Sequence, residues 1–393
     1  MAVVINGTTG IDTVQDGSIV TADIADDAVN STKIDNSILL GRRNILRNGA
    51  MRISQRNGGT SVTHTGSAYH VDRVKHNLAG STSSRYSIQR LDTAPPTGFT
   101  HYYRRQCTTA ESIQSGTQSS FDDHRIESSD LQQLSWGSSS ISKSVTLSFW
   151  IKGNVTGTYA VWFYAPLGGS TKMMTKTYTI DTSDTWEYKT ITIPPRDDVV
   201  MTDVTSAGLY VRFIWNTGTG NTSGTQNSTW GTDTTTDRYV GHGVNLASAT
   251  GNYIEMTGTQ LEAGTVATQF EHRTRDEYTF DCQRYCQAWA ESGDAVAFAG
   301  KGQGTTSIDF GWPLAVPLRA SPTITQTGTG WRAFRPTANL VASTATASVT
   351  RFGTQHPFIA LRVGSFPSSS FTNNYAVNIG PHTLSQFIFD SEL

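Results

Sequence analysis

The first forty residues carry apolar side chains at an interval that fits neither a helix nor a strand. From residue 14 onward, one apolar residue falls on every fifth position, at Val14, Ile19, Ile24, Val29, Ile34 and Leu39. An α-helix would repeat such positions every three or four residues, and a half-buried strand every two. One apolar side chain in five cannot close a core within a single chain, so the stripe predicts a seam between several copies. The alternative is a flexible leader with accidental spacing.

Strand patterns dominate residues 42–275. The segment SVTLSFWIKG alternates cleanly, with Val145, Leu147, Phe149 and Ile151 on one face. Similar segments follow at TGTYAVWFYA, TWEYKTITIP and GLYVRFIW, each bounded by turn residues. Repeated strands without helical patterns between them predict a β-sandwich or jelly roll rather than a βαβ fold.

One helix is expected at residues 276–291. Thr274 and Glu277 have the spacing of a capping box, and Gly293 is placed to end the helix. Its apolar face would consist of Tyr278, Cys282, Tyr285, Cys286 and Trp289. Short strands then return, and the three prolines of GWPLAVPLRASPTIT suit edge strands. We therefore expect residues 292–393 to form a smaller β-sandwich.

Composition and charge narrow the classes of function. The sequence has 30 basic and 32 acidic residues, so nothing in its net charge of -2 favours nucleic acid or an anionic membrane. It lacks an apolar run long enough for a membrane span, and MAVVINGTTG lacks the features of a secretory signal. The cysteines Cys107, Cys282 and Cys286 are too few for a disulfide framework. Synthesis in a reducing cytoplasm is expected.

Five motifs follow one another between Arg42 and Trp289. They are RRNILRNGAMRISQRNGGTS, YHVDRV, RIESSDLQQLSWGSSSISKSVTLSFWIKG, TWEYKTITIPP and GNYIEMTGTQLEAGTVATQFEHRTRDEYTFDCQRYCQAW. This series resembles a module of tail-fibre and related virion proteins of tailed bacteriophages. The leader INGTTGIDTVQDGSIVTADIADDAVNSTKI and the ending FIFDSEL are similar to parts of such proteins.

The resemblance implies a jelly roll like that of carbohydrate-binding modules, a usually trimeric fibre, and host attachment. The chain departs from the family at Val74, Gln269 and Cys286, where the family often has an aromatic residue, Pro and Tyr. Residues from about 300 to 387 resemble no part of the family. Modules of this kind often hold a structural calcium, for which this sequence assigns no ligands.

No catalytic or cofactor motif is recognisable, so we expect neither a catalytic residue nor a metal site nor a cofactor. Cys282 and Cys286 share a helical turn but have no third ligand nearby, which favours two buried thiols. The histidines His64, His70 and His76 are expected in loops or at the surface. A glycan depolymerase would need a cleft lined by carboxylates.

The neighbouring acidic pairs Asp122–Asp123 and Asp197–Asp198 read as solvated turns instead. A depolymerase is therefore the less favoured alternative.

Receptor contacts are expected in the part of the chain that departs from the family. Sugar recognition favours exposed aromatic faces beside polar or charged donors. The segments GTGWRAFRPTANL and FTNNYAVN offer Trp331, Arg332, Phe334, Arg335 and Tyr375 as candidates. Five other tryptophans lie within or beside strand patterns, and most of them are expected in cores: Trp136, Trp150, Trp162, Trp186 and Trp215.

The arginines of GRRNILRNGAMRISQR are expected to pair with acidic groups of neighbouring subunits or of another virion protein. A basic patch for an anionic glycan is the alternative.

Together with the resemblance, these observations predict a mainly β, non-enzymatic virion protein that is part of the phage tail. Residues 1–41 would attach to the tail and form a homotrimer, residues 42–275 the jelly roll, residues 276–291 the connecting helix, and residues 292–393 the tip. The partners would be other copies of the chain, a tail or baseplate protein, and a host-surface glycan bound multivalently. Neither nucleic acid nor membrane insertion is expected. The main alternative is an adaptor that connects fibres to the tail without touching the host.

Overall fold

The protein is described by a computed structural model. The described residues are 41–80, 85–111, 116–167, 170–199, 202–291, 298–328, 330–334, 339–342, 347–367, 371, 376–381 and 385–393. Arg42–Leu393 form one compact unit. The proposed seam residues Val14, Ile19, Ile24, Val29, Ile34 and Leu39 lie outside the described residues, so the seam stays a prediction.

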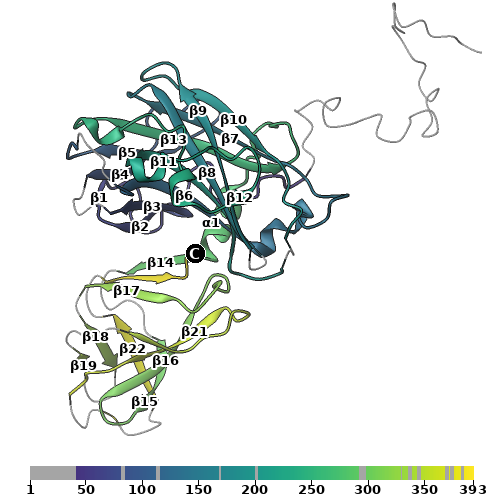
Figure 1. Ribbon diagram of the computed structural model, residues 1–393. Helices are drawn as coiled ribbons and strands as arrows, with labels where there is room; N and C mark the ends of the chain where they lie inside the picture. Colours follow the sequence, from purple (N-terminus) through teal and green to yellow (C-terminus); the bar gives the residue numbers. More distant parts are fainter. Residues whose placement is uncertain are drawn as a thin grey trace, which may run out of the picture. The chain divides into compact units, whose positions relative to one another are not determined.

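The first part of this unit is an antiparallel jelly-roll sandwich of two sheets (Figure 1). The six-stranded sheet has the order β1 (Val62–His64), β4 (Tyr86–Leu91), β5 (Tyr102–Cys107), β13 (Tyr253–Ala263), β7 (Val145–Gly153) and β10 (Glu187–Ile193). The seven-stranded sheet has the order β12 (Gly231–Thr232), β9 (Ser170–Ile180), β8 (Gly157–Leu167), β11 (Ala207–Thr217), β6 (Ser119–Glu127), β3 (Val74–Ala79) and β2 (Ser67–Val71). The prediction of a mainly β jelly roll is confirmed.

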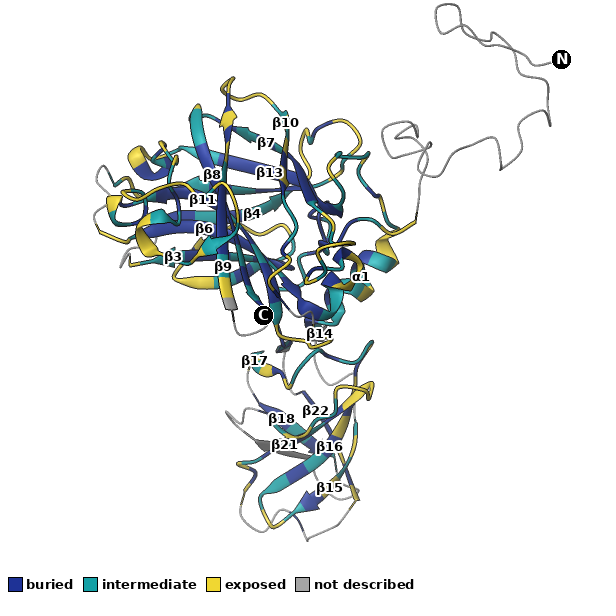
Figure 2. Cartoon of the chain, turned by 45° about the vertical axis from the view of Figure 1, so that its right-hand side comes forward, coloured by how far each residue is buried: buried dark blue, intermediate teal, exposed yellow. Residues whose placement is uncertain are grey.

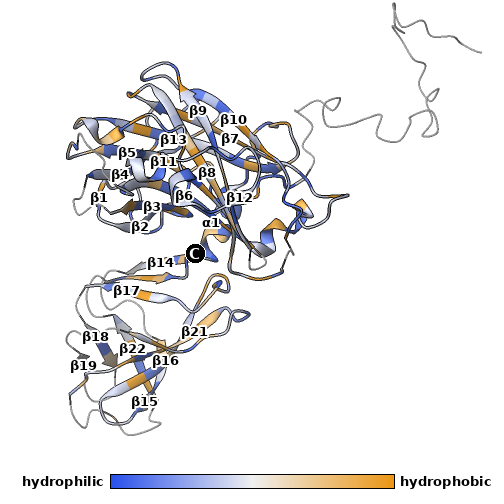
Figure 3. Cartoon of the chain, in the orientation of Figure 1, coloured by the Kyte–Doolittle hydropathy of each residue, from blue (hydrophilic) through white to orange (hydrophobic). Residues whose placement is uncertain are grey.

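The alternation of apolar and polar residues explains how the sheets pack. In β7 the predicted inward residues Val145, Leu147, Phe149 and Ile151 are all fully buried. They join one core with side chains of the opposite sheet, such as Phe213. Buried segments concentrate on the central strands in Figure 2, and hydrophobic and hydrophilic segments alternate along the strands in Figure 3. Burial of these faces supplies the main stabilisation of the sandwich.

The second part of the unit has a three-stranded and a seven-stranded sheet around a core that includes Trp312, Trp331 and Phe387. The first has the order β14 (Cys286–Glu291), β23 (Ser385–Asp390) and β17 (Thr323–Thr327). The second has the order β19 (Asn339–Ala342), β18 (Trp331–Phe334), β22 (Ala376–Pro381), β15 (Phe298–Gln303), β16 (Ser307–Pro313), β21 (Phe358–Val363) and β20 (Ser348–Arg351).

The connecting helix is shorter than the sequence predicts. α1 covers Arg275–Gln283, and the capping box between Thr274 and Glu277 is present. The chain then turns, and β14 begins at Cys286 and pairs antiparallel with β23. Helical spacing from Tyr285 to Trp289 was therefore a wrong guide, because pairing with a strand distant in sequence overrides a weak local preference. No helix among the described residues is long and apolar enough to span a membrane.

The chain returns from the second part to the first at its last strand. The end of β23 and the residues after it contact the jelly roll: Asp390 pairs with Arg56 at 2.8 Å, and Glu392 pairs with Arg73. The second part is thus connected to the jelly roll by α1 and β14 on one side and by β23 on the other.

A buried polar cluster lies at one edge of the jelly roll. His64, His70 and His76 come from β1, β2 and β3, and their ring centroids are 5.3 to 6.1 Å apart. His76 Nδ1 lies 2.8 Å from a carboxylate oxygen of Asp122, which also accepts from Arg105 at 2.5 Å. The expectation of loop or surface histidines is wrong, since His64 and His76 are fully buried.

The pair Asp122–Asp123 is buried as well, which contradicts the expectation of solvated carboxylates. Asp122 pairs with Arg105, and Asp123 pairs with Arg212 at 2.6 Å. Arg105 of β5 in the opposite sheet and Arg212 of the adjacent strand β11 make this burial tolerable, a condition that the spacing along one strand does not reveal.

Candidate functional site

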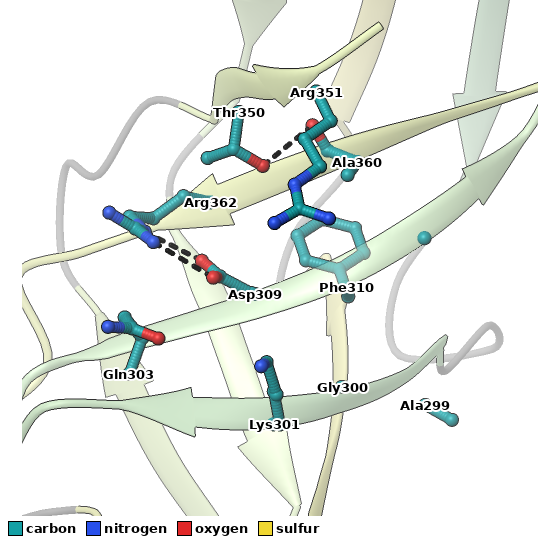
Figure 4. A pocket seen from close by; sticks show the side chains of 11 residues that line it. Ala299, Gly300, Lys301, Gln303, Asp309, Phe310, Thr350, Arg351, Ala360 and Arg362 are labelled. Carbon is teal, nitrogen blue, oxygen red and sulfur yellow. Dashed lines mark hydrogen bonds and ion pairs between the residues drawn. The ribbon is translucent and has the colours of Figure 1, made fainter. Parts of the chain in front are cut away.

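A groove of about 790 Å³ lies on the outer face of the seven-stranded sheet in the second part (Figure 4). It crosses β15, β16, β21 and β20. Its floor is low because small residues meet across the strands: Gly311 of β16 pairs with Ala360 of β21. Ala360 in turn is opposite Arg351 of β20. Large side chains at Gly311 and Ala360 would fill the groove.

One side of the groove carries a row of charged residues. Lys301, Asp309 and Arg362 are opposite one another on β15, β16 and β21. Arg362 donates two hydrogen bonds to Asp309, at 2.6 and 2.9 Å. Figure 4 shows these side chains and that of Arg351 on the same face of the sheet. The groove is therefore lined by three cationic side chains and one carboxylate.

The charges do not cancel. Hydrogen bonds from Arg362 hold the pKa of Asp309 below its ordinary value, and Lys301 and Arg351 lower it further. Asp309 is therefore ionised at neutral pH and fully engaged by Arg362. Within the described part of the chain, no carboxylate forms an ion pair with Lys301 or Arg351. Two cations thus remain available to a ligand, beside the amide of Gln303 and the hydroxyl of Thr350.

This arrangement suits the binding of a polar ligand. Open grooves with a few convergent polar groups on a rigid sheet bind extended polar ligands. General acid–base cleavage of a sugar chain would require two carboxyl groups. Asp309 is the only one that lines the groove as the structure describes it.

The structure separates the five predicted receptor contacts. Trp331 is fully buried and donates to Gln326 at 3.1 Å, so its assignment to a receptor contact is wrong. Arg332 and Phe334 alternate with the buried Trp331 and Ala333, so they lie on the outer face of β18. Arg335 and Tyr375 lie outside the described residues.

Sequence reasoning missed the groove residues themselves. Ile308 and Leu361 are buried on the inner face of the sheet. Alternation in SIDFGWP and FIALRV therefore places Asp309 and Arg362 on its outer face. That signal was present, but only the pairing of β15, β16 and β21 brings the charges together.

A second surface with exposed aromatic rings lies on the outer face of the six-stranded sheet. Trp150 of β7 and Tyr188 of β10 are opposite each other, with ring centroids 5.4 Å apart, and Tyr188 is 44% exposed. Nearby, the ammonium group of Lys152 lies 5.4 Å above the ring of Trp186. Both tryptophans are half-buried. The core assignment is confirmed for the other three, Trp136, Trp162 and Trp215.

The arginine-rich segment pairs within its own chain. Arg42 contacts Glu277, and Arg47 contacts both Asp130 and Asp281 at about 3 Å. For Arg42 and Arg47, these contacts correct the expectation of pairing with neighbouring subunits or another virion protein. Arg52 of the same segment has a different environment, described below.

Among the described residues, no group of three or more His, Cys, Asp or Glu side chains is placed to hold a metal ion. Cys107, Cys282 and Cys286 are free and buried. Burial raises the pKa of the Cys282 thiol well above its ordinary value, so this thiol stays protonated and unreactive at neutral pH.

The chain is similar in fold to several solved structures. The chain matches no protein-family model, and it matches no curated protein. Solved structures with similar folds include a tailspike enzymatic domain of bacteriophage CBA120, with 10% identity over 56% of this chain and a TM-score of 0.29. The chain spans 21% of the length of that domain.

Two further structures are a candidate sugar-binding protein from Bacteroides thetaiotaomicron and a xylan-binding domain from Paenibacillus barcinonensis. The first shows 11% identity over 56% of this chain and 100% of its own, with a TM-score of 0.32. The second shows 9% identity over 54% of this chain and 99% of its own, with a TM-score of 0.25.

Proposed function

We propose that this chain is a non-enzymatic phage tail-fibre protein that binds a host-surface glycan. The groove of the second part would hold an acidic segment of that glycan. Residues 1–41 would join three copies and attach them to the tail or baseplate. Three weak sites on each fibre would then act together, because linked sites raise the effective concentration of each other.

The groove is the observation that carries this proposal. Lys301 and Arg351 offer two uncompensated cations above a floor of small residues. An acidic polysaccharide supplies the matching carboxylate or phosphate groups and enough hydroxyls for Gln303 and Thr350. On a separate surface, the exposed rings of Trp150 and Tyr188 on the jelly roll favour sugars as well, since sugar rings pack on aromatic faces.

Binding should be measured with the purified full chain on an array of bacterial surface polysaccharides. We expect one or a few acidic glycans to bind. The double variant Lys301→Gln/Arg351→Gln should lose at least about tenfold in affinity, because two charge-assisted hydrogen-bond donors are removed. The matched control is Lys172→Gln/Lys176→Gln, which removes the same charge from β9 of the jelly roll.

Filling the groove offers a test that does not alter charge. A Cβ atom added at Gly311 would meet no other atom within 4 Å, so Gly311→Leu should fold normally. Its side chain would nevertheless occupy the floor and abolish binding, whereas Gly311→Ala should have a smaller effect. If both variants bind as the wild type does while Tyr188→Ala loses binding, the glycan site is on the jelly roll instead.

The alternatives predict other results. An adaptor would bind isolated tail protein but none of the glycans. A depolymerase would release reducing ends from its polysaccharide during incubation, an activity that this proposal excludes.

A further inference from the structure

A separate pocket beside α1 is lined by three arginines and a histidine. It measures about 320 Å³, and its charged lining consists of Arg52, Arg90, His101 and Arg275. Arg90 lies near the end of β4, and Arg275 is the first residue of α1. No carboxylate is among the described residues that line it.

These arginines are exceptions in this protein. Most described arginines have a carboxylate within ion-pair distance, including Arg47, Arg105, Arg212 and Arg284. In the described part of the chain, Arg52, Arg90 and Arg275 form no ion pair. Concentration of unpaired cations in one pocket is costly unless an anion joins them, because like charges repel.

Neutral groups hold two of the guanidinium groups in position. Arg90 donates to the backbone carbonyl groups of Gly58 and Arg52, at 3.2 and 3.0 Å. Arg52 donates to the carbonyl of Arg273 at 3.4 Å and lies over the ring of Tyr278, 5.7 Å from its centroid. These contacts orient the two side chains but do not neutralise their charges. Their remaining N–H groups are available to an oxyanion.

The nearby carboxylates offset this charge only in part, and from outside the pocket. Burial lowers the pKa of Arg90, and the charge of Arg275 lowers it further. The charges of Asp92 and Asp72 act in the opposite direction. However, neither carboxylate lines the pocket, and Asp72 is buried with hydrogen bonds from Gln55. Burial also lowers the pKa of His101, with a contribution from Arg90, so this imidazole is neutral at pH 7 and offers a hydrogen bond.

From this geometry we propose that the pocket binds the phosphoryl group of a phosphorylated sugar. A phosphate monoester carries a charge of about -1.5 to -2 and three acceptor oxygens, which three guanidinium groups can satisfy. A carboxylate offers only one charge and two oxygens. A pocket of about 320 Å³ also has room for one sugar ring beside the phosphate. This site is independent of the groove and of the proposed role in adsorption.

Calorimetric titration of the full chain with inorganic phosphate and glucose 1-phosphate tests the proposal. Both should bind, in competition with each other, and more weakly as salt is raised. Arg275→Gln should weaken both by about tenfold or more, because one charge-assisted contact is lost. Arg275 is exposed, so this variant should fold normally, which the thermal midpoint will verify. Lys172→Gln is the charge-matched control.

Two ligands and one groove variant complete the experiment. Glucose should not bind, and glucuronate should bind at least about tenfold more weakly than glucose 1-phosphate. Gly311→Leu, which fills the groove, should leave phosphate binding unchanged. Equal affinity for glucuronate, equal losses in Arg275→Gln and Lys172→Gln, or no phosphate binding to the wild type would each overturn the proposal.

Discussion

At the scale of single residues, burial has changed the chemistry of several histidines. His64 is fully buried beside His70 and His76, and His64 Nδ1 lies 3.1 Å from His70 Nε2. Burial, with the nearby charge of Arg105, lowers the pKa of His64 to about 2. Burial, with the charge of His76, lowers the pKa of His70 to about 3. These imidazoles are therefore neutral in the folded protein over most of the pH range.

We expect this burial to make the protein less stable in mild acid. The unfolded chain takes up protons on His64 and His70 below a pKa of about 6.5, whereas the folded chain does not. The free energy of unfolding is therefore highest above that pH. It falls as the pH drops, by up to about 1.4 kcal/mol per histidine per pH unit. Urea unfolding between pH 7.5 and 4.5 will measure the fall.

His64→Gln should reduce the number of protons taken up on unfolding by roughly one, which makes the pH dependence less steep. His356→Gln, at an exposed site, should leave it unchanged. A wild-type free energy of unfolding that does not vary between pH 6.5 and 4.5 would contradict the assignment.

At the scale of elements, local sequence sets where α1 begins, and pairing with a distant strand sets where it ends. Its start follows local rules, since the hydroxyl oxygen of Thr274 accepts from the backbone N–H of Glu277 at 3.3 Å. Its end does not, because the residues from Cys286 onward pair with β23. The strand connects the two parts of the unit, and Trp289 in it packs edge-on against Trp312, with centroids 5.0 Å apart.

The cap of α1 gives a prediction at this scale. Thr274→Ala removes the acceptor of the capping box, so the free energy of unfolding should fall by about 1 kcal/mol. Thr279→Ala, on a half-buried position of the same helix, should cost less than about 0.5 kcal/mol. Chemical denaturation of both variants will compare them. Equal losses would show that the cap contributes nothing specific to stability.

At the scale of the whole molecule, the homotrimer remains a prediction. The mass of the full chain in solution should be three times 42.7 kDa if the five-residue stripe is the seam. A version that begins at Gly41 should then be monomeric, because it lacks every seam residue. Light scattering of both proteins will decide. A trimer in both would place the seam in the described unit, and a monomer in both would contradict the account of the first forty residues.

Sequence by itself determined what depends on short-range pattern. The alternation that buries Val145, Leu147, Phe149 and Ile151 identified the jelly roll, because successive strand side chains point to opposite faces. The capping box located the start of α1 for a similar reason: both of its partners lie within one turn.

Only the tertiary structure decided which distant residues meet. The order of strands brought Lys301, Asp309 and Arg362 into one row, and Arg52, Arg90 and Arg275 around one pocket. It also gave Asp122 the partner Arg105, which makes a buried carboxylate tolerable where the sequence suggested a solvated one. Strand pairing across long sequence separations depends on the packing of the whole core, and no periodicity along the chain records it.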